Sequence, residues 1–72
     1  MPRLPRWTAS EAETALSRAG FVLLRSKGSH RIYGKGELRV TVPFHSGVML
    51  HPKVVKQVLE MVEEAGGTEN PE

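Results

Sequence analysis

The chain has no cysteine and no aspartate, and these two absences exclude several kinds of catalytic site. Without cysteine there is no disulfide, thiolate metal site or cysteine nucleophile, and a reducing compartment is expected. A Ser-His-Asp triad lacks its aspartate. All eight acidic residues are glutamates, and only Glu37 falls between the two predicted helices. Because two-metal nuclease chemistry needs several carboxylate oxygens around its ions, we predict metal-free chemistry and no cofactor.

Long hydrophobic runs are also missing. Met1–Trp7 holds two arginines and two prolines with no apolar run behind it, so neither a signal peptide nor a membrane span is predicted, and a cytoplasmic location is expected. A length of 72 residues suits one small domain with a modest core. We predict an N-terminal arm over residues 1–7, a single domain over 8–66 and a flexible acidic tail over 67–72.

The charge of the chain is unevenly distributed. Residues 1–56 hold all ten Lys and Arg against three glutamates, which gives +7. Residues 57–72 hold five glutamates and no cation, which gives −5. A basic body in a chain with a pI near 9.4 is typical of a nucleic-acid-binding protein. A solvated surface that is merely basic gives the same pattern, so charge alone does not decide the function.

The local patterns predict a helix at each end of the domain. Thr8-Ala9-Ser10-Glu11 has the spacing of a capping box, and Gly20 ends the helix that follows. Pro52 suits the first position of a second helix, for which His51 is the cap and Gly66-Gly67 the stop.

Three short strands are predicted between these helices: Phe21–Leu24, His30–Tyr33 and Leu38–Val42, with a turn at Ser26–Ser29 and a glycine-rich loop at Gly34–Gly36. The expected architecture is α+β, with an antiparallel three-stranded sheet and both helices on one face. Strict alternation turns His30 and Ile32 toward the helices, but the turn before His30 can reorient its side chain, so the orientation of His30 stays open. The open face is then lined by Arg31, Tyr33, Arg39 and Thr41.

Gly28-Ser29-His30, in the basic stretch 25–31, is the motif with the clearest chemical meaning. Histidine accepts and returns a proton near neutral pH, and RNA supplies its own nucleophile in the 2′-hydroxyl. One imidazole that removes this proton and a second acid that protonates the leaving 5′-oxygen suffice for strand scission without metal. Arg25, Lys27 or Arg31 can stabilise the charge that builds on phosphorus.

Each histidine also has a plain structural explanation. His30 and His45 fit ordinary surface or loop positions, and His51 fits a helix entry. A zinc site made by the three histidines has no supporting ligand spacing. Tyr33 and Phe44 suit either stacking on bases or packing in the core.

The motifs Gly20-Phe21, Arg25, Gly28-Ser29-His30 with Tyr33, and Val42-Pro43-Phe44-His45 together resemble the HicA (YcfA-like) toxins, over about Thr8 to Val62. This resemblance implies a double-stranded-RNA-binding-domain-like α-β-β-β-α fold and metal-independent cleavage of mRNA. It implies that His30 is catalytic, that Gly28 and Ser29 support it, and that His45 is the second histidine of the family. It also implies a HicB-like antitoxin as partner. The last helix departs from the family pattern, because it ends in glutamates instead of a basic segment.

The sequence therefore predicts a toxin endoribonuclease (mRNA interferase) that works by histidine acid/base catalysis. The residues expected to bind RNA are Arg25, Lys27, Arg31, Tyr33, Lys35, Arg39 and Lys53. Two alternatives stay open: a non-catalytic RNA-binding module, and a protein-interaction domain whose basic face meets an acidic partner.

Overall fold

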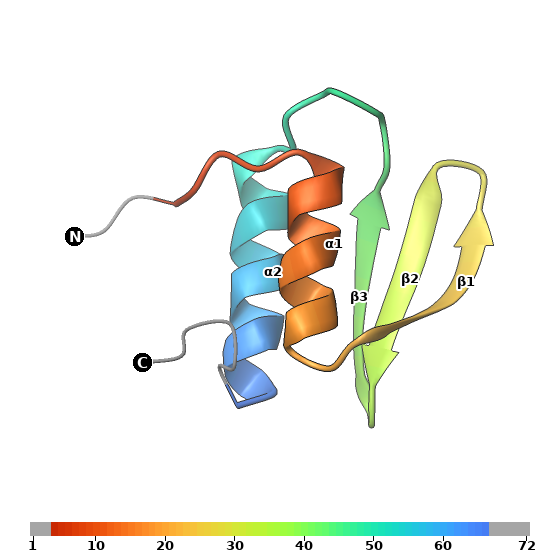
Figure 1. Cartoon of the computed structure of the whole chain (residues 1–72), viewed down its shortest axis with the longest axis vertical. Helices are drawn as coiled ribbons and strands as arrows, with labels where there is room; N and C mark the ends of the chain where they lie inside the picture. The colour runs from red at the N-terminus through yellow and green to blue at the C-terminus, as the bar shows by residue number, and fades with distance from the viewer. Residues whose placement is uncertain (1–3, 67–72) are drawn as a thin grey trace.

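A computed structural model describes residues 4–66 (Figure 1). The proposed tail at 67–72 and the first residues of the proposed arm lie outside this range. The elements are α1 (Ala9–Arg18), β1 (Val22–Lys27), β2 (His30–Lys35), β3 (Leu38–Pro43) and α2 (Pro52–Glu64). The predicted α-β-β-β-α order and the α+β class are thus confirmed. Neither helix is long and apolar enough to cross a bilayer.

Both helices begin as the sequence predicts. At α1 the Thr8 hydroxyl accepts from the Glu11 N–H, and a Glu11 carboxylate oxygen accepts from the Thr8 N–H at 2.8 Å. At α2 the His51 Nδ1 accepts from the Lys53 N–H at 3.1 Å, with Pro52 in the first turn. Each cap occupies backbone donors that the helix itself leaves unpaired, so the ends of both helices are fixed locally.

The three strands form one antiparallel sheet in the order β1-β2-β3. The second and third strands are in continuous register from the pair His30 and Pro43 to the pair Lys35 and Leu38. The predicted loop at Gly34–Gly36 is wrong, because Gly34 and Lys35 belong to β2 and the turn is at residues 36–37. The first strand also runs to Lys27, and its pairing with β2 is interrupted by a bulge at Leu24.

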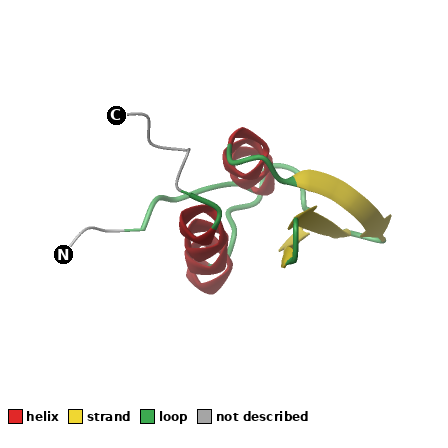
Figure 2. Ribbon diagram, turned by 90° about the horizontal axis from the view of Figure 1, so that it is seen from below, coloured by secondary structure: helices red, strands yellow, loops and turns green. Residues whose placement is uncertain are grey.

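Both helices lie on one side of the sheet and pack against β3, as Figure 2 shows. The core between the layers contains Leu16 from α1, Val58 from α2 and Val42 from β3, all fully buried. Tyr33 of β2 joins this core and is 6% exposed. The core is therefore built over β3 and half of β2, while β1 lies outside it.

The prediction that Arg31 and Tyr33 line the open face of the sheet is wrong. Residues directly opposite in an antiparallel pair share a face, and Arg31 and Tyr33 lie opposite the buried Val42 and Val40. Arg31 and Tyr33 therefore face the helices. His30 belongs to the other set of positions and faces away from them, as do Arg39 and Thr41, which were correctly predicted on the open face.

Lys35 joins the ends of the two helices. Its Nζ donates to the Ala19 carbonyl at 2.7 Å and to the Ala65 carbonyl at 3.3 Å. These are the C-cap residues of α1 and α2, where unpaired carbonyls attract a cation. Gly20 has a φ of 98°, and a Cβ there would lie 3.0 Å from the Lys35 Nζ, so glycine both ends α1 and leaves room for the lysine.

Candidate active site and nucleic-acid interface

His30 is the first residue of β2 and is exposed. The turn before it consists of Gly28 and Ser29, with Lys27 and His30 as the pair that closes it. Gly28 has a φ of 59°, and no residue other than glycine has a positive φ in residues 4–66. This is the pattern of a two-residue hairpin turn with glycine at its first position. The turn therefore holds His30 at the end of the sheet formed by the β1–β2 hairpin, beside Lys27.

The loop between β3 and α2 meets this turn. The Phe44 N–H donates to the Ser29 carbonyl at 2.6 Å, and His30 lies opposite Pro43 in the sheet. His45 follows directly, so the two histidines singled out in the sequence belong to segments that meet at one end of the sheet. Gly28 and Ser29 form the turn at this end.

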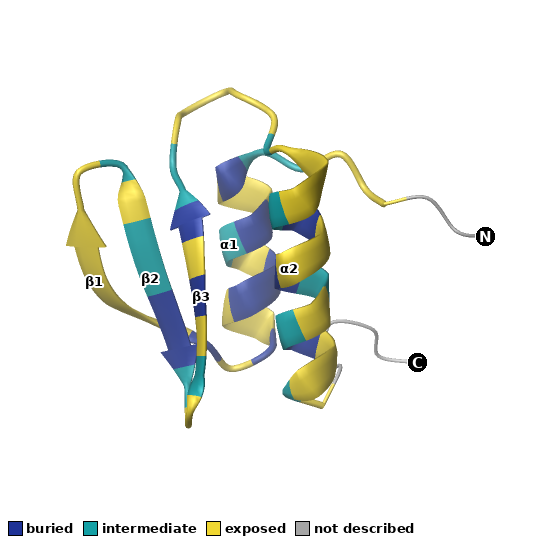
Figure 3. Cartoon of the chain, turned by 180° about the vertical axis from the view of Figure 1, so that it is seen from behind, coloured by how far each residue is buried: buried dark blue, intermediate teal, exposed yellow. Residues whose placement is uncertain are grey.

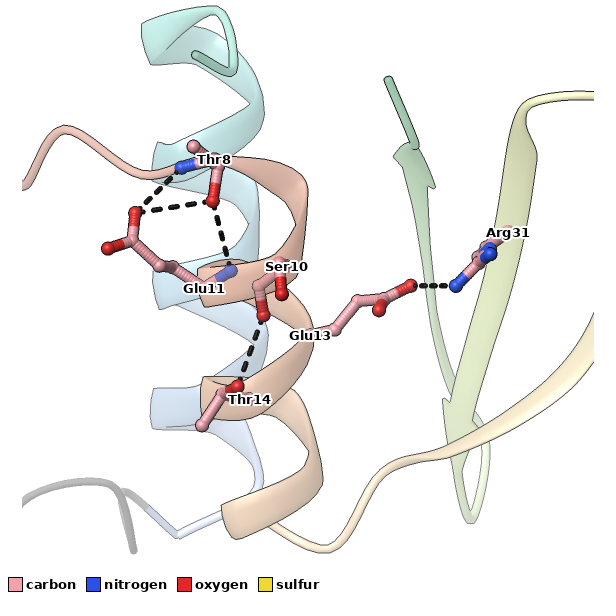
Figure 4. Close-up of polar contacts among 6 residues, drawn as sticks. All are labelled: Thr8, Ser10, Glu11, Glu13, Thr14 and Arg31. Atoms are coloured by element: carbon pink, nitrogen blue, oxygen red, sulfur yellow. Dashed lines mark hydrogen bonds and ion pairs between the residues drawn. The ribbon is translucent and has the colours of Figure 1, made fainter. Parts of the chain in front are cut away.

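Arg31 is held from two sides on the helix-facing side of β2. Its Nη1 donates to the Glu13 carboxylate of α1 at 2.9 Å (Figure 4). Its guanidinium lies 4.0 Å from the centre of the Phe44 ring. The hydrogen bond to Glu13 is the main reason that the pKa of Arg31 is raised above its usual value. Arg31 thus links α1, β2 and the loop after β3 directly beside His30.

Sequence reasoning missed Glu13. A signal for it is present, because Glu13 follows Ala9 by four residues and precedes Leu16 by three, next to the apolar stripe of α1. A carboxylate at the edge of a buried stripe needs a partner from the opposing layer. Arg31 is that partner.

Tyr33 lies against the same carboxylate. Burial, followed by the Glu13 carboxylate, raises the pKa of Tyr33 to about 12 from 10.0. Because this folded-state pKa lies above the unfolded value, the tyrosine's contribution to stability is complete below pH 10.0 and is lost as the pH rises toward about 12. Tyr33 is the single tyrosine of the chain, so the near-ultraviolet absorbance of tyrosinate should report this titration alone. A midpoint near 10.0 in the folded protein would contradict the buried placement.

Replacing Glu13 with glutamine should have two linked effects. The free energy of unfolding should fall by about 0.5–1 kcal/mol, since the ion pair is only partly shielded from water. The pKa of Tyr33 should also fall, but stay above its ordinary value because burial remains the larger cause. Denaturant titration and tyrosinate absorbance measure the two effects. Glu11→Gln, which retains a capping side chain, is the matched control, and an equal shift of the Tyr33 pKa there would contradict the assignment.

The predicted RNA-binding residues divide into two groups. Arg25 and Lys27 lie opposite Ile32 and His30, on the open face. Arg39 is on the same face, and its Nη1 donates to the carbonyls of Gly36 and Leu38 at 2.8 and 2.7 Å.

The other predicted residues lie elsewhere. Arg31, Tyr33 and Lys35 are on the helix side with the intramolecular partners described above. Lys53 is exposed in the first turn of α2. The structure thus gathers Arg25, Lys27, His30 and Arg39 on one face.

The remaining sequence predictions for histidine concern His51 and metal. The capping role of His51 is confirmed by its bond to the Lys53 N–H. Within residues 4–66, no group of three His, Cys, Asp or Glu side chains is placed to hold a metal ion.

The chain is thus a small α-β-β-β-α domain of the α+β class, with an exposed histidine and several cations on the open face of its sheet. Residues 9–66 match the family described as HicA toxin of bacterial toxin–antitoxin, and the chain belongs to this family. No curated protein sequence matched the chain significantly. The resemblance noted in the sequence is thus confirmed. The chain is a toxin of a toxin–antitoxin system, which implies an antitoxin partner.

Proposed function

We propose that this toxin is an endoribonuclease that cleaves mRNA without metal, with His30 as its catalytic residue. The observation that carries the proposal is the position of His30: exposed, next to the Gly28-Ser29 turn, and paired across the sheet with Lys27. The proposed setting is the cytoplasm, with a HicB-like protein as the antitoxin.

The proposed reaction uses the nucleophile that RNA carries. His30 removes the proton of a 2′-hydroxyl, the 2′-oxygen forms a bond to phosphorus, and the bond from phosphorus to the 5′-oxygen breaks. A protonated group returns a proton to the leaving 5′-oxygen, and we assign this role to His45, which lies at the same end of the sheet. We assign to Lys27, the cross-strand partner of His30, the stabilisation of the negative charge that builds on the phosphorane.

The proposed RNA contacts are Arg25, Lys27 and Arg39, since these cations share the open face with His30. Tyr33 is buried and Lys35 caps the helices, so we do not include them. Arg31 takes a positioning role instead, because Glu13 and the Phe44 ring hold its guanidinium on the helix side.

RNA affinity should therefore depend on salt. Three neutralised phosphates give a slope of about −2 for log affinity against log salt concentration on single-stranded RNA. Lys27→Ala should reduce this slope by about 0.7, whereas Lys56→Ala, on the exposed side of α2, should leave it unchanged. Fluorescence anisotropy with a labelled oligonucleotide measures both. Equal effects of the two variants would contradict the proposed interface.

The test of the function is cleavage by the purified chain of a single-stranded RNA in EDTA, beside the same sequence with 2′-hydroxyls replaced by hydrogen. We expect the RNA to be cut in EDTA and the 2′-deoxy strand to survive. Loss of cleavage in EDTA would overturn the metal-free mechanism. The second candidate function, a non-catalytic RNA-binding module, uses the same basic face and predicts binding with no cleavage under either condition.

A further inference from the structure

The residues of β1 are more exposed to solvent than those of β2 and β3. All six residues of β1 are exposed, as Figure 3 shows by colour. Three of them are consecutive large apolar residues: Val22, Leu23 and Leu24 are 58%, 48% and 47% exposed. Contiguous exposed apolar side chains beside polar residues are a feature of interaction surfaces.

The reason is the position of the strand in the fold. The helices pack on β3, and β1 is the outer strand farthest from them (Figure 1). Within residues 4–66 it pairs only with β2, so in this part of the chain its outer edge presents backbone N–H and C=O groups with no strand beside them. Leu24 lies across Gly34 on the open face, where a Cβ on residue 34 would come within 2.5 Å of its methyl group. The apolar side chains therefore cover both faces of an open edge.

A groove adjoins this edge on the helix side. It has a volume of about 450 Å³. Its lining consists of Ser10, Glu13, Thr14 and Ser17 of α1 together with Phe21, Val22, Leu23 and Tyr33. Phe21 and Tyr33 on its sheet side belong to the core, whereas its α1 side is polar. This groove offers space for a side chain of a strand added beside β1.

We propose that the antitoxin of this toxin adds an extended segment to the free edge of β1, with apolar residues against Val22–Leu24 and acidic residues beside Arg25 and Lys27. The occupant is argued from two observations. The chain belongs to a family of toxins that work with an antitoxin, and the same strand that exposes apolar side chains ends in two cations. Strand addition uses backbone hydrogen bonds for affinity and alternate side chains for specificity.

A second copy of this chain fits the edge less well. In the central antiparallel register of two β1 strands, Lys27 lies against Val22 and Arg25 against Leu24. Each such pair sets a cation beside an apolar side chain, and the cations of both copies gather on one surface. A strand from the antitoxin with apolar and acidic residues avoids both the pairing of cations with apolar side chains and the crowding of like charges.

This binding mode is inferred from the family and not from the proposed cleavage of RNA. It nevertheless predicts how the antitoxin would affect RNA binding. Lys27 pairs with His30, so an antitoxin strand beside Lys27 covers the cations that border the proposed catalytic residue. Binding at the edge of β1 would thus block RNA without any change in the fold of the toxin.

Hydrogen exchange measured by mass spectrometry tests the location. The full chain is purified alone and in complex with the antitoxin encoded with it. We expect the amides of residues 22–27 to exchange at least about tenfold more slowly in the complex, because the outer edge gains hydrogen bonds. If a stable complex forms and these amides exchange as in the free toxin, the proposal is overturned. Concentration-dependent protection of the same amides in the free toxin, with dimers in solution, overturns it as well.

Matched substitutions test the side chains. Val22 and Val48 are 58% and 56% exposed, and only Val22 is on β1. By isothermal titration with the antitoxin, Val22→Lys and Leu24→Lys should each weaken binding by about tenfold or more, whereas Val48→Lys should change it by less than about twofold. Circular dichroism and thermal unfolding confirm that each variant is folded. Equal weakening by Val22→Lys and Val48→Lys would overturn the proposal.

A single-stranded RNA oligonucleotide separates this surface from the proposed RNA interface. Val22→Lys should bind the oligonucleotide at least as well as the unchanged chain, since it adds a cation near the open face. If Val22→Lys loses RNA and keeps the antitoxin, β1 serves RNA and the proposal fails. Both binding measurements stand even if the chain cuts no RNA.

Discussion

Replacing His30 with alanine should lower the rate of RNA cleavage by about 10²- to 10⁴-fold, the range typical of a lost general acid or base. Growth arrest on induced expression should be lost with it. The effect should be chemical and not structural, because His30 is exposed and no hydrogen bond that its side chain makes is seen in the described residues. Surface substitutions of this kind change the free energy of unfolding by about 0.5 kcal/mol or less.

His51 provides the matched control. It is also an exposed histidine, but its ring serves as the cap of α2. His51→Asn keeps an acceptor for the Lys53 N–H and should retain full cleavage. Cleavage by His30→Ala at the rate of the unchanged chain would contradict the proposed role, and so would an equal loss in His51→Asn. RNA affinity should survive in His30→Ala, since the cations that bind phosphate are untouched.

Replacing Lys35 with methionine should lower the free energy of unfolding by about 2 kcal/mol, a large share of the stability of so small a domain. Methionine keeps most of the length and apolar stem of lysine but removes the donors to the Ala19 and Ala65 carbonyls. Two helix ends then lose their shared cation at once. The midpoint of thermal unfolding should fall on the order of 10 °C.

Lys56→Met is the control for Lys35→Met. Lys56 is exposed in the middle of α2, so its replacement should change stability by about 0.5 kcal/mol or less. If Lys35→Met unfolds at the same denaturant concentration as Lys56→Met, Lys35 does not join the helix ends in solution. The result would then leave Lys35 free for the RNA contact that its sequence context first suggested.

The parts of the fold that could be predicted are those with a local cause. The Thr8 capping box, the stop at Gly20 and the Pro52 start each depend on a few neighbouring residues. The alternation of Leu38, Val40 and Val42 likewise fixed the buried face of β3.

The facing of β2 could not be predicted, because it depends on a register that is set elsewhere. A three-residue loop at 34–36 would pair Tyr33 with Glu37 and turn Ile32 and His30 toward the helices. The observed turn lies at residues 36–37 and pairs Tyr33 with Val40, an odd shift that reverses the faces. The same shift turned His30 outward and brought Arg31 to Glu13. The sequence therefore left the orientation of His30 open and placed Arg31 and Tyr33 on the wrong face, and the register of the strands decides both.

The structure of the cleavage products tests the central claim most directly. The purified toxin is incubated with a short RNA in EDTA, and the new ends are identified by mass spectrometry. Attack by the 2′-hydroxyl, with His30 as the base, predicts a 2′,3′-cyclic phosphate on one fragment and a 5′-hydroxyl on the other. Fragments with a 3′-hydroxyl and a 5′-phosphate would mean that water is the nucleophile, and would contradict the account.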